Sequence, residues 1–388
     1  MPKLARNYDY QRYDNLYAFE QFRQSHNYNN TDYVKPHKRV KPHRKFNPVK
    51  SLVSVFALMF FLFVIMPFGF THITKQIFIP TPYKNVKTDM EKLAFPASYL
   101  ANSNVLNKPT FVYSAPEKKA QMVKIKENVN TPSLHSELLN LMELYPEIKP
   151  AIYVWNYETE NYIDINADKI YSTASIIKIP VLIDLFKTIE LGQIRLTDTI
   201  PLREYFRTEG SGNLQFKAAN SIWTIDELAK RMITISDNSA TNMLMTELGS
   251  MEDVNQSIRN WGLKNTEVKT WLPDLKGNNH TTAREMGQML YNIDSNEKFL
   301  SEFSRKKIFD YMGHVKNDRL IQAGLGAGST FLHKTGDIGS MLGDAGIVTT
   351  PNSKKYIAVI MANRPHNDPK AAEFIVKASE IIYNYMVK

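Results

Sequence analysis

The feature that most constrains this chain of 388 residues is an uncharged apolar run from Ser51 to Phe70, SLVSVFALMFFLFVIMPFGF. No Asp, Glu, Lys or Arg follows it until Lys75. About 20 consecutive apolar residues are enough for a helix to cross the hydrocarbon core of a bilayer. A buried core helix is rarely so long, and a cleaved signal peptide would have a far shorter n-region than the 50 residues that precede this run. We therefore predict one transmembrane helix at 51–72.

The residues before this run are basic and predict its orientation. Residues 1–50 contain 11 Lys or Arg against 4 Asp or Glu, and most of the positive charges lie close to the apolar run. Because cytoplasmic flanks of membrane helices carry such an excess, we expect a cytoplasmic N-terminus and an extracytoplasmic body. The tail is rich in Tyr and Asn and has little apolar periodicity, which predicts a disordered cytoplasmic arm. Contact of its Tyr and basic residues with RNA or lipid headgroups is the alternative.

Beyond the apolar run the chain divides into two regions. Residues 73–131 contain scattered Pro, Asn and Lys without a sustained period, which predicts an extracytoplasmic stalk. Residues 132–388 have a globular pattern and a net charge near −3, so the overall charge of +9 comes from the tail and the stalk. This argues against nucleic acid as a partner, because a binding domain would itself carry the basic face. The chain has no cysteine, which excludes disulfides and thiolate metal sites.

Short periodic segments in the globular region predict its local structure. An amphipathic helix is expected at 134–144, followed by a hairpin of two strands at 151–157 and 162–166. Thr224, with Glu227 three residues later, forms a capping box, which predicts the first turn of another helix.

The run SIIK from Ser175 to Lys178 places a hydroxyl and an ammonium one helical turn apart on the same face. A serine is a poor nucleophile unless a neighbour accepts its proton, and a desolvated lysine can do so. The positive end of the helix dipole would stabilise the charge of a tetrahedral intermediate. Apolar residues at 181–191 predict a mostly buried helix downstream. A second S-x-x-K match, from Ser304 to Lys307, is interpreted as a solvated charged helix.

Two further motifs are weak signals when each is taken alone. The SDN at 236–238 interrupts the apolar pattern between two predicted helices, which a simple turn would also explain. Lys334 and Thr335 stand at the end of a predicted strand, where they would bind a carboxylate, and Gly336 would let a substrate backbone approach the strand edge. We interpret His333 as a strand residue rather than a metal ligand, because no H-x-x-x-H pattern accompanies it.

The order and intervals of S-x-x-K, S-D-N and K-T-G, with the flanking GSGNLQ at 210–215 and SDNSATN at 236–242, resemble the class A β-lactamase-related serine hydrolase family, which includes penicillin-binding proteins. The resemblance covers roughly residues 132–388. It implies an α/β (α+β) fold of the β-lactamase/DD-peptidase type. That fold has an antiparallel sheet flanked by helices and an all-helical subdomain, with the site between them. It implies no metal and no other cofactor.

The resemblance also implies a role for each matching residue. Ser175 is the expected acylated nucleophile, Lys178 the base that helps to take its proton, and Ser236 the hydroxyl that passes a proton to the leaving nitrogen. Asn238 is expected to hold the substrate's side-chain amide, and the backbone N–H groups of Ser175 and Asp337 form the expected oxyanion hole. The remaining expected substrate-binding residues lie on the predicted strand: Lys334, Thr335 and Gly336.

One position departs from the family pattern. Class A enzymes carry a stretch like W-E-P-E-L-N between the second and third motifs, where this chain reads WLPDLK from Trp271 to Lys276. Leu272 replaces the glutamate that activates the deacylating water, and general-base help of this kind is worth about 10²–10⁴-fold. Asp274 is the nearest carboxylate that could substitute. We therefore expect Ser175 to be acylated and the ester to turn over slowly.

These observations predict a membrane-anchored, extracytoplasmic serine hydrolase whose partner is a β-lactam or a peptidoglycan stem peptide. Two alternatives stay open. A D-Ala-D-Ala carboxypeptidase or transpeptidase on the same fold would release D-alanine, and a non-catalytic scaffold would bind the cell wall only. The intact trio of Ser175, Lys178 and Ser236 speaks against the scaffold, whereas Leu272 mildly favours either alternative over a working β-lactamase.

Overall fold

The computed structural model describes residues 121–388. The predicted tail, the predicted membrane helix at 51–72 and most of the predicted stalk lie outside the described residues. Within 121–388, no helix is both long and apolar enough to cross a membrane.

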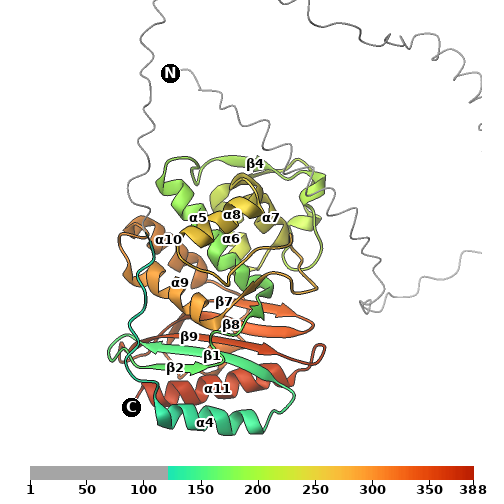
Figure 1. Cartoon of the computed structure of the whole chain (residues 1–388). Helices are drawn as coiled ribbons and strands as arrows, with labels where there is room; N and C mark the ends of the chain where they lie inside the picture. Colours follow the sequence, from blue (N-terminus) through green and yellow to red (C-terminus); the bar gives the residue numbers. More distant parts are fainter. Residues whose placement is uncertain (1–120) are drawn as a thin grey trace, which may run out of the picture. The chain divides into compact units, whose positions relative to one another are not determined.

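A five-stranded antiparallel sheet with the order β2-β1-β9-β8-β7 forms the centre of the fold (Figure 1). The last strand in the chain, β9, pairs with both β1 and β8 and so joins the N-terminal hairpin to the C-terminal one. Strand β9 is buried at every position from Tyr356 to Ala362, because helices cover both faces of the sheet. The strands are β1 (Lys149–Asn156), β2 (Tyr162–Ile165), β7 (Thr330–Ile338), β8 (Met341–Thr349) and β9 (Lys355–Asn363).

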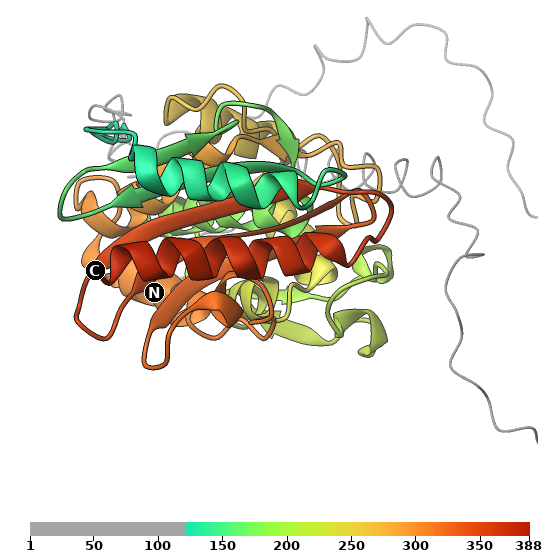
Figure 2. The same cartoon turned by 90° about the horizontal axis from the view of Figure 1, so that it is seen from below.

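Two helices, α4 (Pro132–Glu143) and α11 (Lys370–Met386), lie side by side on one face of the sheet (Figure 2). Leu134 and Leu138, one helical turn apart on α4, are fully buried in this core together with Phe374 of α11. The apolar faces of α4 and α11 therefore cover this face of the sheet.

The opposite face carries α9 (Ala283–Ser295) and joins the helical half of the molecule. There α5 is buried continuously from Lys178 to Phe186, as expected for a helix that is apolar all round. The helices of this half are α5 (Lys178–Glu190), α6 (Ile225–Thr234), α7 (Asn238–Glu247), α8 (Met251–Asn260) and α10 (Glu302–Met312). The short elements are β3 (Tyr171–Ser172), β4 (Thr199–Pro201), β5 (Ile222–Thr224), β6 (His280–Thr281), η5 (Ala174–Ile177), η6 (Glu204–Phe206), η7 (Leu214–Phe216) and η8 (Ile321–Gly324).

The local predictions for the first helix, the hairpin and the capping box are confirmed by α4, by β1 with β2, and by the start of α6. Thr224 Oγ1 accepts a hydrogen bond from the Glu227 N–H (3.2 Å), and Glu227 Oε2 accepts one from the Thr224 N–H (2.9 Å). The second S-x-x-K match lies on α10, but Ser304 is not solvated. It is buried and its Oγ donates to Glu190 Oε1 (2.6 Å).

Residues 121–131, which the sequence assigned to the stalk, pack against the sheet and α9. The indole N–H of Trp155 donates to the carbonyl of Lys126 (2.8 Å), and the hydroxyl of Tyr153 donates to Glu127 Oε1 (2.9 Å). Both aromatic residues belong to β1. This segment is therefore held by side chains of the central sheet.

Candidate active site

Ser175 lies in the short helix η5, which runs directly into the N-terminus of α5. The residue before it, Ala174, has φ 44°, a left-handed conformation that residues with a side chain rarely adopt. Thr173 anchors this strained turn, because both its N–H (2.9 Å) and its Oγ1 (3.1 Å) donate to the carbonyl of Asn279. Strain of this kind persists where the surroundings fix it, and it is common at functional sites.

The ammonium of Lys178 is the centre of the site. Lys178 is fully buried, and its Nζ is 2.9 Å from Ser175 Oγ and 3.0 Å from Ser236 Oγ. The same nitrogen is 2.7 Å from the Ser236 carbonyl oxygen and 2.9 Å from Asn238 Oδ1. One side chain therefore joins the first predicted motif to the second.

Burial lowers the pKa of Lys178 well below its usual value, and the positive charge of Lys334 lowers it further, while Asp237 opposes the shift. A neutral amine has two N–H groups and one lone pair. It can therefore accept a proton from one hydroxyl while it donates to other acceptors. This is the geometry of a general base placed between two serines.

Ser236 occupies a strained turn between α6 and α7, with φ 57°. The next residue, Asp237, holds the turn in place with a carboxylate that is only 1% exposed. That carboxylate caps α7 by accepting from the Ala240 N–H (3.0 Å), and it also accepts from the N–H groups of Asn213 (2.8 Å) and Leu214 (2.9 Å). The sequence indicated both a turn and a candidate catalytic motif here, and the structure shows the turn. The sequence did not indicate that Asp237 positions this turn.

The Asn238 amide is buried between Lys178 and the loop that precedes η7. Its Nδ2 donates to the Glu209 carbonyl (3.1 Å), which leaves a second N–H for a substrate carbonyl. Gly210 has φ 91°, and a Cβ at this position would lie 2.8 Å from Asn238 Nδ2. A side chain at 210 would therefore displace the amide, which explains the glycine.

The third predicted motif lies on β7, the edge strand of the sheet next to β8. Lys334 is 1% exposed, and its Nζ donates to the Thr335 carbonyl (2.8 Å). Burial lowers the pKa of Lys334 to about 8, and the negative charge of Asp344 partly opposes this shift. Gly336 faces the turn that carries the nucleophile, since a Cβ there would lie 2.6 Å from the Thr173 carbonyl oxygen. The strand can approach Ser175 only because this residue lacks a side chain.

These residues meet at a cleft of about 470 Å³. Its lining includes Ser175, Ser236, Lys334, Thr335 and Asp337 from the predicted set. Lys178 lies behind this lining and contacts Ser236 Oγ (3.0 Å) and Asn238 Oδ1 (2.9 Å). Gly336 packs against η5. The other lining residues come mainly from the end of α6 and the segment before η8: Ser211, Ile233, Thr234, Ile235, Val315, Lys316, Asn317, Asp318 and Arg319.

Leu272 is buried, 3% exposed, in a loop that carries a cis peptide bond between Leu272 and Pro273. Asp274, the carboxylate that could replace the missing glutamate, is engaged elsewhere. Its two oxygens accept from the N–H groups of Asn278 (3.0 Å) and Asn279 (2.6 Å) in its own loop. Lys276 is exposed. Asp274 therefore acts as a loop cap in this arrangement.

His333 lies on β7, as the sequence indicated, and it faces away from Lys334 because neighbouring strand residues alternate. Its Nδ1 is 2.8 Å from Asp344 Oδ1, and its ring stacks on Phe331 with centroids 4.3 Å apart. Asp344 is fully buried. This pair was not predictable from the sequence, since the two residues lie on different strands.

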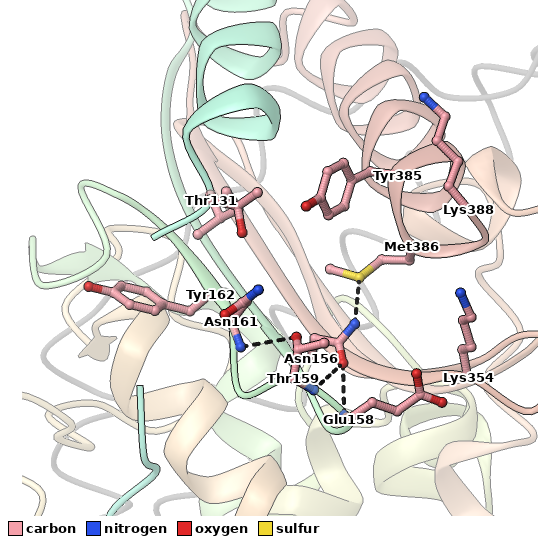
Figure 3. Close-up of a pocket in the computed structure, with 11 residues that line it drawn as sticks. Thr131, Asn156, Glu158, Thr159, Asn161, Tyr162, Lys354, Tyr385, Met386 and Lys388 are labelled. Atoms are coloured by element: carbon pink, nitrogen blue, oxygen red, sulfur yellow. Dashed lines mark hydrogen bonds between the residues drawn. The ribbon is translucent and has the colours of Figure 1, made fainter. Parts of the chain in front are cut away.

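A second cavity, of about 250 Å³, lies where the β1–β2 turn meets the end of α11 (Figure 3). Asn156 organises it: its Oδ1 accepts from the N–H groups of Glu158 (2.8 Å) and Thr159 (3.1 Å), and its Nδ2 contacts Met386 Sδ (3.3 Å). None of the predicted site residues lines this cavity. The predicted site residues therefore gather at the first cleft.

Comparisons with known proteins agree with this geometry. The structure resembles PBP-A with a TM-score of 0.65, at 35% identity over 68% of this chain and 98% of that one. A PBP-A variant in which a leucine was replaced by glutamate, described as an acyl-enzyme complex with penicillin G, matches at 34% identity with the same coverage and TM-score. An ancestral class A β-lactamase has the same fold, with a TM-score of 0.61 at 22% identity over 65% of this chain and 99% of that one.

Sequence comparison gives the same answer. The β-lactamase ROB-1 of Haemophilus influenzae is 24% identical over 257 residues, which are 62% of this chain and 80% of that protein. The sequence profile described as the Beta-lactamase enzyme family matches residues 133–386. With its three motifs assembled at one cleft, this chain belongs to the β-lactamase and penicillin-binding protein-like family of serine hydrolases.

Proposed function

We propose that this protein is a membrane-anchored, extracytoplasmic serine hydrolase that forms an acyl-enzyme through Ser175 with β-lactams or related cell-wall peptides. The observation that carries the proposal is the position of Lys178 Nζ, 2.9 Å from Ser175 Oγ and 3.0 Å from Ser236 Oγ. From there it can take the proton of the nucleophile, and Ser236 can pass a proton to the leaving nitrogen.

A slow deacylation step follows from the residues of the loop in which the family has its general base. A leucine at 272 cannot accept a proton from water. Asp274 keeps both carboxylate oxygens on backbone N–H groups of its loop. Without a general base the ester between Ser175 and the acyl group is long-lived. The anchoring in a membrane rests on the apolar run from Ser51 to Phe70 and the basic residues before it.

A penicillin-binding D-Ala-D-Ala carboxypeptidase or transpeptidase is the second candidate. It is favoured by Leu272 and by the 35% identity to PBP-A, against 24% to the β-lactamase ROB-1. A non-catalytic wall scaffold is disfavoured, because keeping Lys178 fully buried without a paired carboxylate costs stability. A protein that only binds the cell wall does not need a buried lysine beside two serines.

Labelling of the full chain in membranes with a fluorescent penicillin tests the proposal. We expect a labelled band on the wild type that persists through a chase with unlabelled penicillin and is absent in Ser175→Ala. The serine of the other S-x-x-K match supplies the control, and Ser304→Ala should keep the band. A band that fades within minutes would mean a working β-lactamase. No band on the wild type would support the scaffold. Release of D-alanine from a pentapeptide would identify the peptidase.

A further inference from the structure

Asp337 presents a carboxylate to the cleft from the edge of β7. Its side chain is 60% exposed and it lines the same cavity as Ser175. Arg364, the residue after β9, forms an ion pair with Asp337 Oδ1 and has a side chain that is only 6% exposed. Arg364 also donates to the Ile338 carbonyl (3.0 Å), so its place does not depend on Asp337 alone.

The ion pair leaves Asp337 able to bind a further cation. A carboxylate offers about four lone-pair positions, and Arg364 uses one oxygen. Among residues 121–388 the hydrogen bonds and ion pairs of Asp337 involve Oδ1 and not Oδ2. Because the guanidinium lies buried behind the carboxylate, a group that enters the cleft meets the carboxylate first.

The position of Asp337 along β7 says which part of a substrate it would meet. Gly336 faces the turn that carries Ser175, because a Cβ there would lie 2.6 Å from the Thr173 carbonyl oxygen. Lys334 is two residues before Gly336 and Asp337 one residue after it. With a rise of about 3.3 Å per residue, the two charges are carried by residues about 10 Å apart along the strand. Lys334 and Asp337 thus bring opposite charges to two points on this strand, and Lys316, Asp318 and Arg319 add further charges to the cleft lining.

We infer that the substrate is a cell-wall peptide with a primary amine on its acyl part, and that the Asp337 side chain binds this ammonium while Lys334 and Thr335 bind the terminal carboxylate. The inference rests on the proposed function and names the substrate class of that site. Asp337 is then a specificity residue through its side chain, in addition to the backbone N–H expected to face the oxyanion.

Ampicillin and penicillin G form a matched pair of probes, because they differ by one amino group on the acyl side chain. Rate constants for acylation of the full chain in membranes are measured by competition with a fluorescent penicillin. A pH of about 6.5 keeps the amine charged, since an α-amino group has an ordinary pKa of about 7.7–8.0. The measured quantity is the ratio of the two rate constants, ampicillin over penicillin G.

We expect this ratio to fall about threefold in Asp337→Asn, the size of effect of a partly exposed ion pair. Asp318→Asn is the matched control, since Asp318 is a second exposed carboxylate that lines the cleft, and its ratio should not change. An unchanged ratio in Asp337→Asn, or an equal fall in Asp318→Asn, would overturn the inference. Wild-type protein that reacts with neither drug would instead refute the proposed function.

A measurement on the wild-type protein tests the same inference without a substitution, so its result does not depend on the folding of Asp337→Asn. Acetylation of the amine of ampicillin removes its charge and leaves the ring system unchanged. The acylation rate constant for acetylated ampicillin, compared with ampicillin, should fall by about the same threefold factor. An acetylated drug that reacts as fast as ampicillin would overturn the role of Asp337 without any substitution in the protein.

Discussion

The side chain of Asn242 is hydrogen-bonded to both backbone groups of Leu272. The Leu272 N–H donates to Asn242 Oδ1 (3.0 Å), and Asn242 Nδ2 donates to the Leu272 carbonyl (2.7 Å). Thr208 Oγ1 donates to the same carbonyl (3.2 Å). All three contacts involve the backbone at 272. They therefore survive a change of the side chain, and the position can be tested with the loop held in place.

Leu272→Glu is expected to shorten the lifetime of the acyl-enzyme by about 10²-fold, because it restores a carboxylate where the family has its deacylating base. The lifetime is measured by a chase after labelling with a fluorescent penicillin. Leu272→Gln has the same shape without a base and should keep the slow wild-type lifetime. An equal lifetime in all three proteins would show that slow turnover has another cause.

Lys178→Met is expected to lower the acylation rate constant by about 10²–10⁴-fold, because the neutral amine that accepts the Ser175 proton is lost. Its thermal midpoint should not fall in parallel, since a buried lysine with a lowered pKa is itself unfavourable. Lys187→Met, at the other end of α5, is the control. Lys187 Nζ donates to the Phe299 carbonyl (2.7 Å) outside the cleft. Equal losses of acylation in both variants would contradict the assigned role.

Acylation by penicillins should decline as the pH rises through about 8, because Lys334, with a pKa of about 8, then loses the charge that binds the substrate carboxylate. Lys334→Arg keeps its charge and should move this decline to higher pH. The free energy of unfolding changes with pH in the opposite direction to the acylation rate. Between the folded pKa of about 8 and the ordinary 10.5, the unfolded chain binds more protons, so the free energy of unfolding rises with pH. A pH–rate profile without a limb near 8 would refute this assignment.

Asp237→Ala is expected to lower the free energy of unfolding by about 3 kcal/mol, because it removes the cap of α7 and leaves the buried N–H of Leu214 and the partly buried N–H of Asn213 without their carboxylate partner. It should also slow acylation, since the Ser236 turn loses its support. Ser250→Ala removes the more exposed cap of α8, where Ser250 Oγ accepts from the Asp253 N–H (3.2 Å). That control should cost about 1 kcal/mol and leave acylation unchanged. Denaturant unfolding and fluorescent-penicillin labelling measure the two effects.

The sequence by itself determined the features that depend on residues close together in the chain. The hairpin of β1 and β2, the capping box of Thr224 with Glu227, and the one-turn spacing of Ser175 and Lys178 are local and were predicted. The three motifs, read together, also gave the family and the cleft residues. That step relied on resemblance, because periodicity alone could not order the strands of the sheet or pair β9 with β1.

Only the tertiary structure decided how the distant residues act on one another. Lys178 meets Ser236 across 58 positions, and Asn242 meets Leu272 across 30. The same packing buries Ser304, gives Asp274 and Asp237 their backbone partners, and places Arg364 behind Asp337. The physical reason is that desolvation and hydrogen bonding depend on which atoms surround a group. The lowered pKa of Lys178, on which the chemistry depends, arises from burial and from the charge of Lys334, which lies far from it in the chain.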